Sequence, residues 1–314
     1  MPQYYLVPKQ LATRVPALGK LAQSFEAAVF RCVFWLMRRL SLRQATALAG
    51  TFFGLTGPMG DKASKAKTNL GIAFPEADSA WIDSTAKNVF RHLGISAAEL
   101  LKLEQIWAER ESRLEFELEP LAREHLEQKG ATVFVCAHVG AWQLTNFIAG
   151  HMGLNISTIY APESNPALRD IMLSLRHHMG VNLIPSDAGV RPLIKELNRG
   201  NSIGMAMDTR LNTGKLIPFF GREALTNTTA ARLALRTGAA LVPINAVRLP
   251  GQRYRITVYN PLTQPEDDQE TDTDLDARAE ALTLQVNRIF EQWISATPDQ
   301  WICLKRRWPK AHKL

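Results

Sequence analysis

The sequence predicts an α/β fold in which a mixed central sheet is covered by helices. Short apolar segments of strand length alternate along the chain with segments whose apolar residues recur at helical spacing, which is typical of this class. Of the 314 residues, 46% are hydrophobic, enough to fill a sizeable core. Length alone does not require two domains, so we expect one large domain with an N-terminal appendage.

The individual elements follow from the spacing of apolar residues in chain order. Beyond residue 60, the spacing predicts helices over 80–110, 142–148, 167–179, 193–198, 229–237 and 274–295. It predicts strands over 133–137, 156–160, 182–185, 202–207, 240–247 and 254–259. In the last helix, Leu282, Val286 and Phe290 recur every four residues and mark its buried face.

Residues 1–60 are predicted to form a helical segment that contacts a membrane, and residues 61–314 the α/β domain. Arginines interrupt the apolar residues of 25–60, so the segment lacks the ~20 consecutive apolar residues of a spanning helix. Phe34 and Trp35 beside Arg38 and Arg39 are typical of an amphipathic helix at an anionic membrane surface. The alternative is an ordinary buried helix with a basic end.

The charge and the cysteines restrict the partners and the compartment. A formal net charge of +7 favours an acidic partner, whether nucleic acid, anionic lipid or an acidic carrier protein. The three cysteines lie too far apart in sequence for a local metal or redox motif, and a reducing compartment is expected. A GxGxxG turn, a CxxC pair and a GxSxG elbow are all absent from the sequence.

His138 is the first candidate for chemistry. It follows the apolar run 133–137 and precedes a predicted helix, with Gly140 allowing the turn between them. Open α/β sheets bind ligands at the carboxyl ends of their strands, and a neutral imidazole there can act as a base. The alternative is a histidine that caps a helix or is satisfied in the core.

A second group of polar residues follows the predicted strand 202–207. Asp208 and Arg210 come directly after this strand, and an aromatic turn and a polar segment precede the next helix. Side chains and helix N-terminal amides could converge on an anion here. The residues of the turn and the polar segment singled out as candidates are Phe219, Phe220, Gly221 and Thr226. The alternative is a structural turn with a capping Asp, a solvated Arg and an aromatic core plug.

These segments together resemble the bacterial lipid A late acyltransferase family, a branch of the lysophospholipid acyltransferase superfamily. The resemblance covers residues 67–310, and AHVGAWQ (137–143) corresponds to the family's His-x4-acid box. The other matching segments, in family order, are KTNLGIAFPE (67–76), HLGISAAEL (92–100), YAPESNPALRDIMLSLRHHMG (160–180), IPFFGREALTNTTAARLALRTGAALVP (217–243) and PDQWICLKRRWPK (298–310).

The resemblance implies a lysophospholipid-acyltransferase-like fold and an acyltransferase at the cytoplasmic face of a bacterial inner membrane. The donor would be an acyl thioester on acyl carrier protein or coenzyme A, and the acceptor a hydroxyl or amine of a lipid A-like or other polar lipid. No metal, no further cofactor and no nucleic acid are expected. His138 would be the base. The residues implied in substrate binding are Trp142, Asn165, Arg176, Arg210, Phe219, Phe220, Gly221 and Thr226. Those expected to face headgroups or the carrier are Arg38, Arg39, Lys305, Arg306 and Arg307, with a solvated charge run as the alternative for the last three.

One position departs from the family pattern. Gln143 stands where the box normally ends in an acid, and an amide can orient an imidazole but supplies no charge. Asp208 is the candidate for the missing acid, with a structural cap as the alternative. Two other interpretations stay open: a catalytically weakened homologue that binds lipid or forms a complex, and a transferase of an aminoacyl or short acyl group.

Overall fold

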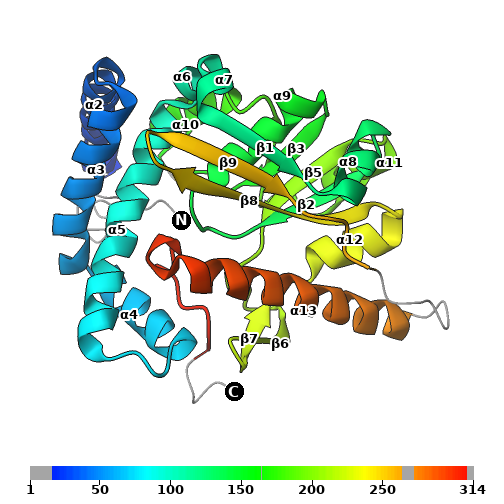
Figure 1. The fold of residues 1–314 in the computed structure, drawn as a ribbon. Coiled ribbons are helices and arrows are strands. Elements are labelled where there is room, and N and C mark those ends of the chain that lie inside the picture. The colour runs from blue at the N-terminus through cyan, green and yellow to red at the C-terminus, as the bar shows by residue number, and fades with distance from the viewer. Residues whose placement is uncertain (1–15, 164, 264–271, 310–314) are drawn as a thin grey trace.

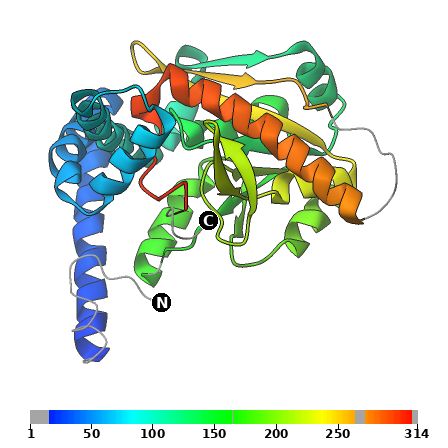
Figure 2. The ribbon, with the colours of Figure 1, turned by 90° about the horizontal axis from the view of Figure 1, so that it is seen from below.

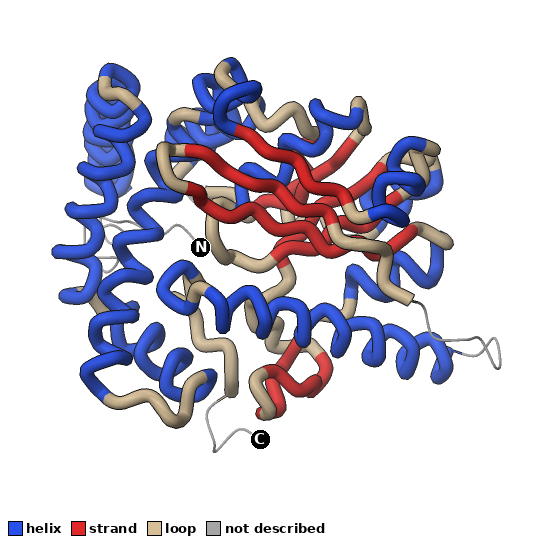
Figure 3. The backbone as a smooth tube through the Cα atoms, in the orientation of Figure 1, coloured by secondary structure: helices blue, strands red, loops and turns tan. Residues whose placement is uncertain are grey.

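The fold is built on a seven-stranded mixed sheet, seen in a computed structural model that describes residues 16–163, 165–263 and 272–309 (Figure 1). Its strands are β1 (Leu114–Leu118), β2 (Thr132–Cys136), β3 (Ile156–Tyr160), β4 (Asn182–Pro185), β5 (Ser202–Ala206), β8 (Ala240–Leu249) and β9 (Arg253–Val258). They lie in the order β1-β9-β8-β2-β5-β3-β4, and only the β8/β9 pairing is antiparallel (Figure 3). A separate hairpin joins β6 (Lys215–Phe219) to β7 (Arg222–Thr226).

Helices surround the sheet. In chain order, those of the N-terminal third are α2 (Pro16–Arg39), α3 (Leu42–Thr56), η1 (Gly57–Met59), α4 (Lys62–Ala73), α5 (Ser79–Leu101), α6 (Leu103–Ala108) and α7 (Arg110–Arg113). The remainder are α8 (Pro120–Glu127), η2 (Trp142–Phe147), α9 (Ile148–Met152), α10 (Pro166–His177), α11 (Arg191–Asn198), α12 (Thr229–Thr237), α13 (Asp272–Ala296) and η3 (Pro298–Gln300).

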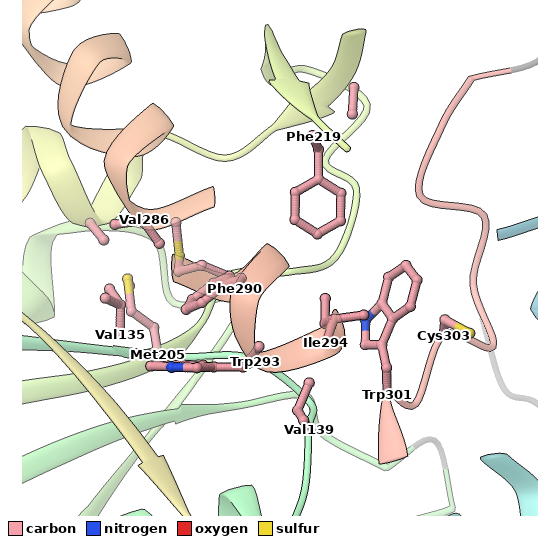
Figure 4. Close-up of a cluster of buried hydrophobic side chains, with 14 of the residues drawn as sticks. Val135, Val139, Met205, Phe219, Val286, Phe290, Trp293, Ile294, Trp301 and Cys303 are labelled. Carbon is pink, nitrogen blue, oxygen red and sulfur yellow. The ribbon is translucent and has the colours of Figure 1, made fainter. Parts of the chain in front are cut away.

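Two apolar cores lie on opposite faces of the sheet, because successive strand residues point to opposite sides. On β2, Val133 and Val135 join the core formed with α11, α12 and α13, whereas Phe134 joins the core formed with α6, α8 and η2. The long helix α13 packs along the first face (Figure 1). Figure 4 shows part of that core, where Phe290 and Trp293 of α13 lie beside Val135 and Met205 of the sheet.

The structure confirms the predicted α/β fold class, with three differences in its elements. The predicted helix over 80–110 is broken at Lys102, whose ammonium turns away to donate to the carbonyls of Arg38 and Leu40 at the end of α2. Residues 142–147 form a 3-10 helix, so His138 does not precede an α-helix N-terminus as expected. The elements α4, β1, α8 and the β6/β7 hairpin were not predicted from the sequence.

The N-terminal helices lie together at one side of the molecule, and α2 extends beyond the body (Figures 1 and 2). Exposed apolar side chains recur along both helices: Leu21, Phe25, Val29, Val33 and Leu36 on α2, and Leu48, Phe52 and Leu55 on α3. Within the described ranges, no helix has the length and apolarity needed to cross a membrane. Residues 1–15 of the predicted 1–60 unit lie outside those ranges, and the proposed boundary at residue 60 stays a prediction.

Candidate active site

Strand register places His138 next to Asp208. Strands β2 and β5 are parallel neighbours with Cys136 opposite Ala206, and Met207 N donates to Cys136 O at 2.9 Å. His138 and Asp208 each stand two residues beyond these paired positions, so both emerge at the same edge of the sheet. Their side chains meet there, with His138 Nδ1 2.6 Å from Asp208 Oδ1.

The turn after His138 depends on Gly140. Its φ of 61° is left-handed, a conformation that favours glycine. A Cβ at this position would lie 2.4 Å from the carbonyl oxygen of Ala246, so the turn packs closely against β8. Ala141 N also donates to that oxygen at 2.9 Å. The turn is thereby held against the sheet, and His138 with it.

His138 and Asp208 each change the pKa of the other. Burial lowers the pKa of His138, but the Asp208 carboxylate outweighs this effect and raises that pKa above its ordinary value. Burial raises the pKa of Asp208, and the contacts with His138 and Trp301 outweigh it in turn, so the pKa of Asp208 is lowered. An ionised carboxylate only accepts hydrogen bonds, so in the neutral imidazole Nδ1 carries the hydrogen and Nε2 keeps its lone pair.

A pocket of about 300 Å³ opens beside this pair. The His138 side chain is 30% exposed, whereas that of Asp208 is 2% exposed, so only the imidazole faces the pocket. The Trp142 ring meets the imidazole edge to face, with 5.4 Å between ring centroids. Arg176 lines the pocket from α10, paired with Glu163 at 2.7 Å. The inner wall is apolar, formed by Phe134, Ile148, Ile156, Met179, Leu183 and Ile244.

Gln143 lines the same pocket, but its side-chain oxygen does not bond His138. The atom beside the imidazole nitrogen is Asp208 Oδ1, which corrects the expectation that the Gln143 amide orients the imidazole. Its Oε1 atom is buried and accepts no hydrogen bond from any described residue. Its backbone carbonyl accepts from Asn146 Nδ2 at 3.0 Å, and Asn146 Oδ1 accepts from Thr158 at 2.6 Å. The pocket therefore has a polar side near the imidazole.

Arg210 lines a second, more open hollow of about 480 Å³, together with Lys65, Lys305 and Arg306. We call it the basic hollow. No carboxylate is among its lining residues, and none of these four cations forms an ion pair with a residue in the described part of the chain. Lys305 is close enough to act electrostatically on His138. The hollow is thus a strongly positive surface near the His138–Asp208 pair.

Arg307 does not share this surface, which corrects its predicted role in contacting headgroups or a carrier. The side chain is 1% exposed, and it donates to Leu225 O at 3.0 Å and to Thr226 Oγ1 at 2.7 Å. Its guanidinium also lies 4.6 Å from the centroid of the Phe219 ring. Arg307 is therefore an internal link between the C-terminal segment and the β6/β7 hairpin.

The predicted aromatic wall is also placed differently. Phe219 and Thr226 are buried in the interior and line none of the described pockets, which corrects their expected contact with substrate. Phe220 and Gly221 form the tight turn of the β6/β7 hairpin, with φ of 50° and 67°, and they too lie outside the pockets. These residues form the alternative considered from the sequence, a structural turn with an aromatic plug.

The remaining candidates lie around α2. Asn165 is buried, and its Nδ2 donates to Gln23 O at 3.1 Å, so it joins α10 to α2 and lines none of the described pockets. Arg38 faces Glu104 at 3.7 Å on the surface. Arg39 lies over the exposed Trp35 ring at 4.9 Å. No group of three or more potential metal ligands occurs among the described residues.

Sequence reasoning missed Trp301, although the segment 298–310 had been matched as a motif. Its indole Nε1 donates to Asp208 Oδ2 at 3.0 Å, and the next residue, Ile302, donates its backbone N–H to His138 O at 2.9 Å. The pairing joins residues 93 positions apart, and apolar spacing carries no signal of such a contact.

Comparison with known proteins gives a consistent result. The sequence profile described as "Bacterial lipid A biosynthesis acyltransferase" matches residues 10–310. A Mycobacterium tuberculosis phosphatidylinositol mannoside acyltransferase is 26% identical over 181 residues, 56% of this chain and 54% of that protein. The Escherichia coli K12 lipid A biosynthesis lauroyltransferase is 24% identical over 76% of each chain. A lipid A biosynthesis acyltransferase of Haemophilus influenzae is 22% identical over 79% of this chain and 78% of that one.

Proposed function

Because this chain belongs to the bacterial lipid A biosynthesis acyltransferase family, we propose that it moves an acyl group from a thioester to a polar lipid. The donor is an acyl thioester of acyl carrier protein or coenzyme A, and the acceptor a hydroxyl or amine of a lipid A-like or other polar lipid. The 2.6 Å contact between His138 and Asp208 at a pocket is the observation that carries this proposal.

The proposed chemistry is general base catalysis. His138 Nε2 takes the proton of the acceptor hydroxyl or amine as that group attacks the thioester carbonyl carbon. Asp208 holds the imidazole in the required tautomer and stabilises the imidazolium that forms. Collapse of the tetrahedral intermediate breaks the carbon–sulfur bond, and the imidazolium returns the proton to the leaving thiolate. In this scheme Asp208 supplies the charge that Gln143 lacks.

The pocket supports binding of the acyl chain. Its inner wall is apolar, and apolar surfaces removed from water stabilise a bound hydrocarbon chain by about 25 cal/mol per Å². Trp142 stands at the imidazole and Arg176 at the pocket wall, so both are positioned to contact the reacting ends of the substrates. The proposed substrate contacts do not include Phe219, Phe220, Gly221 or Thr226.

The basic hollow supports binding of an acidic group. Four cations line the hollow, Lys65, Arg210, Lys305 and Arg306, and none of them pairs with a carboxylate of the described residues. Cations of this kind attract phosphates and acidic surfaces. We assign Arg210 to the acceptor's phosphate, or to negative charge that develops in the reaction, because a guanidinium suits both roles. Lys305 and Arg306 are assigned to headgroups or to the acidic carrier.

The exposed apolar side chains of α2 and α3 support peripheral or monotopic contact with the cytoplasmic face of a bacterial inner membrane. Apolar residues enter the interface, and cations such as Arg38 and Arg39 face anionic headgroups. Such contact would bring the pocket close to a lipid acceptor. It also fits an acceptor that does not leave the bilayer.

The test is transfer by the purified protein, with the acceptor first identified by mass spectrometry of lipids from cells with and without the gene. His138→Ala should lower the rate at least ~10²- to 10⁴-fold, the range for a positioned base. His177→Ala is the matched control, because this histidine is exposed on α10 and lines no described pocket. Full activity of His138→Ala, with His177→Ala also active, would exclude the proposed base.

A further inference from the structure

The segment 297–309, which we call the strap, runs from α13 between α4 and the β6/β7 hairpin (Figure 1). It contacts both members of the catalytic pair. Trp301 Nε1 donates to Asp208 Oδ2, and Ile302 N donates to His138 O. The strap therefore touches the side chain of the proposed acid and the backbone of the proposed base.

The Trp301 contact restricts the Asp208 carboxylate. A carboxylate rotates readily about its last bond unless both oxygens are bound. Here Oδ1 meets His138 Nδ1 at 2.6 Å and Oδ2 accepts from Trp301 at 3.0 Å, and the backbone of His138 also bonds the carboxylate. Partners on both oxygens thus set the plane of the group. Without the indole N–H, Oδ2 would be a buried acceptor, and the carboxylate would gain freedom to turn from the imidazole.

The Trp301 ring is itself held in one orientation. It is 1% exposed and packs in an aromatic cluster with Phe219, Phe220 and Trp308, at ring centroid distances of 6.1, 6.4 and 6.3 Å. Figure 4 shows the indole between Ile294 of α13 and Cys303 of the strap, with Phe219 beside it. This close packing holds the indole ring in one orientation, in which its N–H is directed at Asp208.

The strap backbone is also fixed. Asn69 of α4 donates to the carbonyls of Cys303 and Lys305, at 2.8 and 2.7 Å, and its Oδ1 accepts from Arg307 N at 3.0 Å. The Arg307 guanidinium adds its two bonds to Leu225 and Thr226 on the other side. These bonds on both sides of the strap hold Trp301 in place before any substrate arrives.

We propose that Trp301 is a positioning residue for acyl transfer, which fixes the Asp208 carboxylate so that its other oxygen faces His138 Nδ1. The inference rests on the proposed function of that pair. Trp301 touches no substrate in this scheme, and it acts only through Asp208. Its loss should therefore lower kcat, because the base is mispositioned, and leave KM nearly unchanged.

Trp301→Phe tests the proposal, because it keeps an aromatic ring and removes the N–H donor together with part of the ring volume. We expect kcat to fall about 10- to 100-fold, the effect of one hydrogen bond to a charged group. Trp308→Phe is the matched control. Trp308 belongs to the same cluster and donates to Phe219 O at 3.3 Å, but it makes no bond to Asp208.

A double-mutant cycle separates positioning from a merely structural role. In an Asp208→Ala background, which removes the group that Trp301 holds, Trp301→Phe should change the residual kcat less than twofold. A structural role would instead give the same loss in both backgrounds. Thermal unfolding of each variant shows whether it is folded.

NMR titration of His138 gives a readout that needs no acyl transfer, with the resonance assigned by its absence in His138→Ala. The charged or titratable groups that act on this pair are Lys305 and Arg307 of the strap and the thiols of Cys136 and Cys303. Burial raises the pKa of the Cys136 thiol to about 12 and raises that of Cys303 as well, so neither thiol ionises near neutrality.

Trp301→Phe should lower the pKa of His138, because a less well oriented Asp208 carboxylate stabilises the imidazolium less. Trp308→Phe should leave that pKa unchanged. An unchanged His138 titration in Trp301→Phe overturns the inference, as does an equal change in both variants. If the parent chain transfers no acyl group, the proposed function fails while this titration still decides the role of Trp301.

Discussion

Under the proposed mechanism, Asp208 supplies the charge that the resemblance led us to expect at the position of Gln143. Gln143 keeps the box position and lines the pocket, while the carboxylate beside the imidazole comes from the end of another strand. The negative charge thus comes from residue 208 and not from residue 143. Substitutions at the two sites should consequently have unequal effects.

Asp208→Asn should lower the transfer rate by up to about 10⁴, because an amide can select the wrong imidazole tautomer. Gln143→Glu should be neutral or harmful, since a second acid near one imidazole raises the pKa of both carboxyls. Rates of the two single variants and the double variant measure this. A fully active Asp208→Asn protein, or a faster Gln143→Glu protein, would show that Asp208 is not the working acid.

The pH profile gives a second prediction at this scale. Histidine acts as a general base only while its imidazole is unprotonated, so kcat/KM should fall as the pH drops through the pKa of His138. Asp208 raises that pKa above its ordinary value of about 6.5, and the acid limb should therefore lie above that pH. Asp208→Asn should move the limb to lower pH in its residual activity. A limb that stays in place would mean that another group titrates.

At the scale of elements, the contact between α3 and α5 sets a steric limit at Gly94. A Cβ there would lie 2.3 Å from the carbonyl oxygen of Ala49, and backbone cannot give way as a flexible side chain can. Gly94→Ala should destabilise the protein by about 1–3 kcal/mol, the cost of overpacking. The free energy of unfolding in urea measures it.

Gly71→Ala in α4 is the control for this prediction. Its Cβ would meet Ile82 at 3.5 Å, an ordinary contact, so only the helix preference of alanine remains. We expect a stabilisation of about 0.4–1 kcal/mol. If both variants behaved alike, the close α3–α5 approach would not limit stability.

Elements with a clear apolar period were predictable from the sequence, and elements set by tertiary contacts were not. The strands of the parallel core are continuous apolar runs, and α13 repeats its buried positions at helical spacing. In β1, LEFEL has an exposed, charged edge, and in β6 a proline interrupts the pattern, so neither stood out. The break at Lys102 depends on the end of α2, which no local pattern reveals.

The residues of the site also divide into those that local sequence patterns predict and those that tertiary contacts place. His138 and Asp208 could be selected because each ends an apolar run, and the neighbouring parallel strands bring them together. Arg307 was assigned to the surface and Phe219 to the pocket because of their residue types and the motifs in which they stand. Their burial results from the strap crossing the β6/β7 hairpin, a contact between segments about 80 residues apart. Sequence spacing does not encode such crossings.

At the scale of the whole molecule, α2 and α3 present exposed apolar side chains on one side of the enzyme. Phe25→Glu and Phe52→Glu should each weaken binding to anionic liposomes roughly tenfold or more, because burial of a phenylalanine contributes about 1.5–3 kcal/mol. Leu121→Glu is the control, since Leu121 is 58% exposed on α8, away from these helices. Liposome co-sedimentation gives the affinities.

Salt separates the contribution of the cations to liposome binding from that of the apolar side chains. Each cation near an anionic surface adds about 1 kcal/mol, so raised ionic strength should weaken binding of the parent chain. Equal binding to neutral and anionic liposomes at all salt concentrations would contradict a role for Arg38 and Arg39.

The position of the strap in the chain has a consequence for biosynthesis. A ribosome adds roughly 5–20 residues per second, so Asp208 waits about 5–20 s for Trp301, which is made 93 residues later. During that time α2 and α3 have already left the ribosome and can reach a bilayer. If Trp301 positions Asp208, and if α2 and α3 bind a bilayer as proposed, a nascent chain meets the membrane before it can catalyse acyl transfer. The enzyme would thus bind the membrane while still inactive, and it would become fully active only when the strap has folded against Asp208.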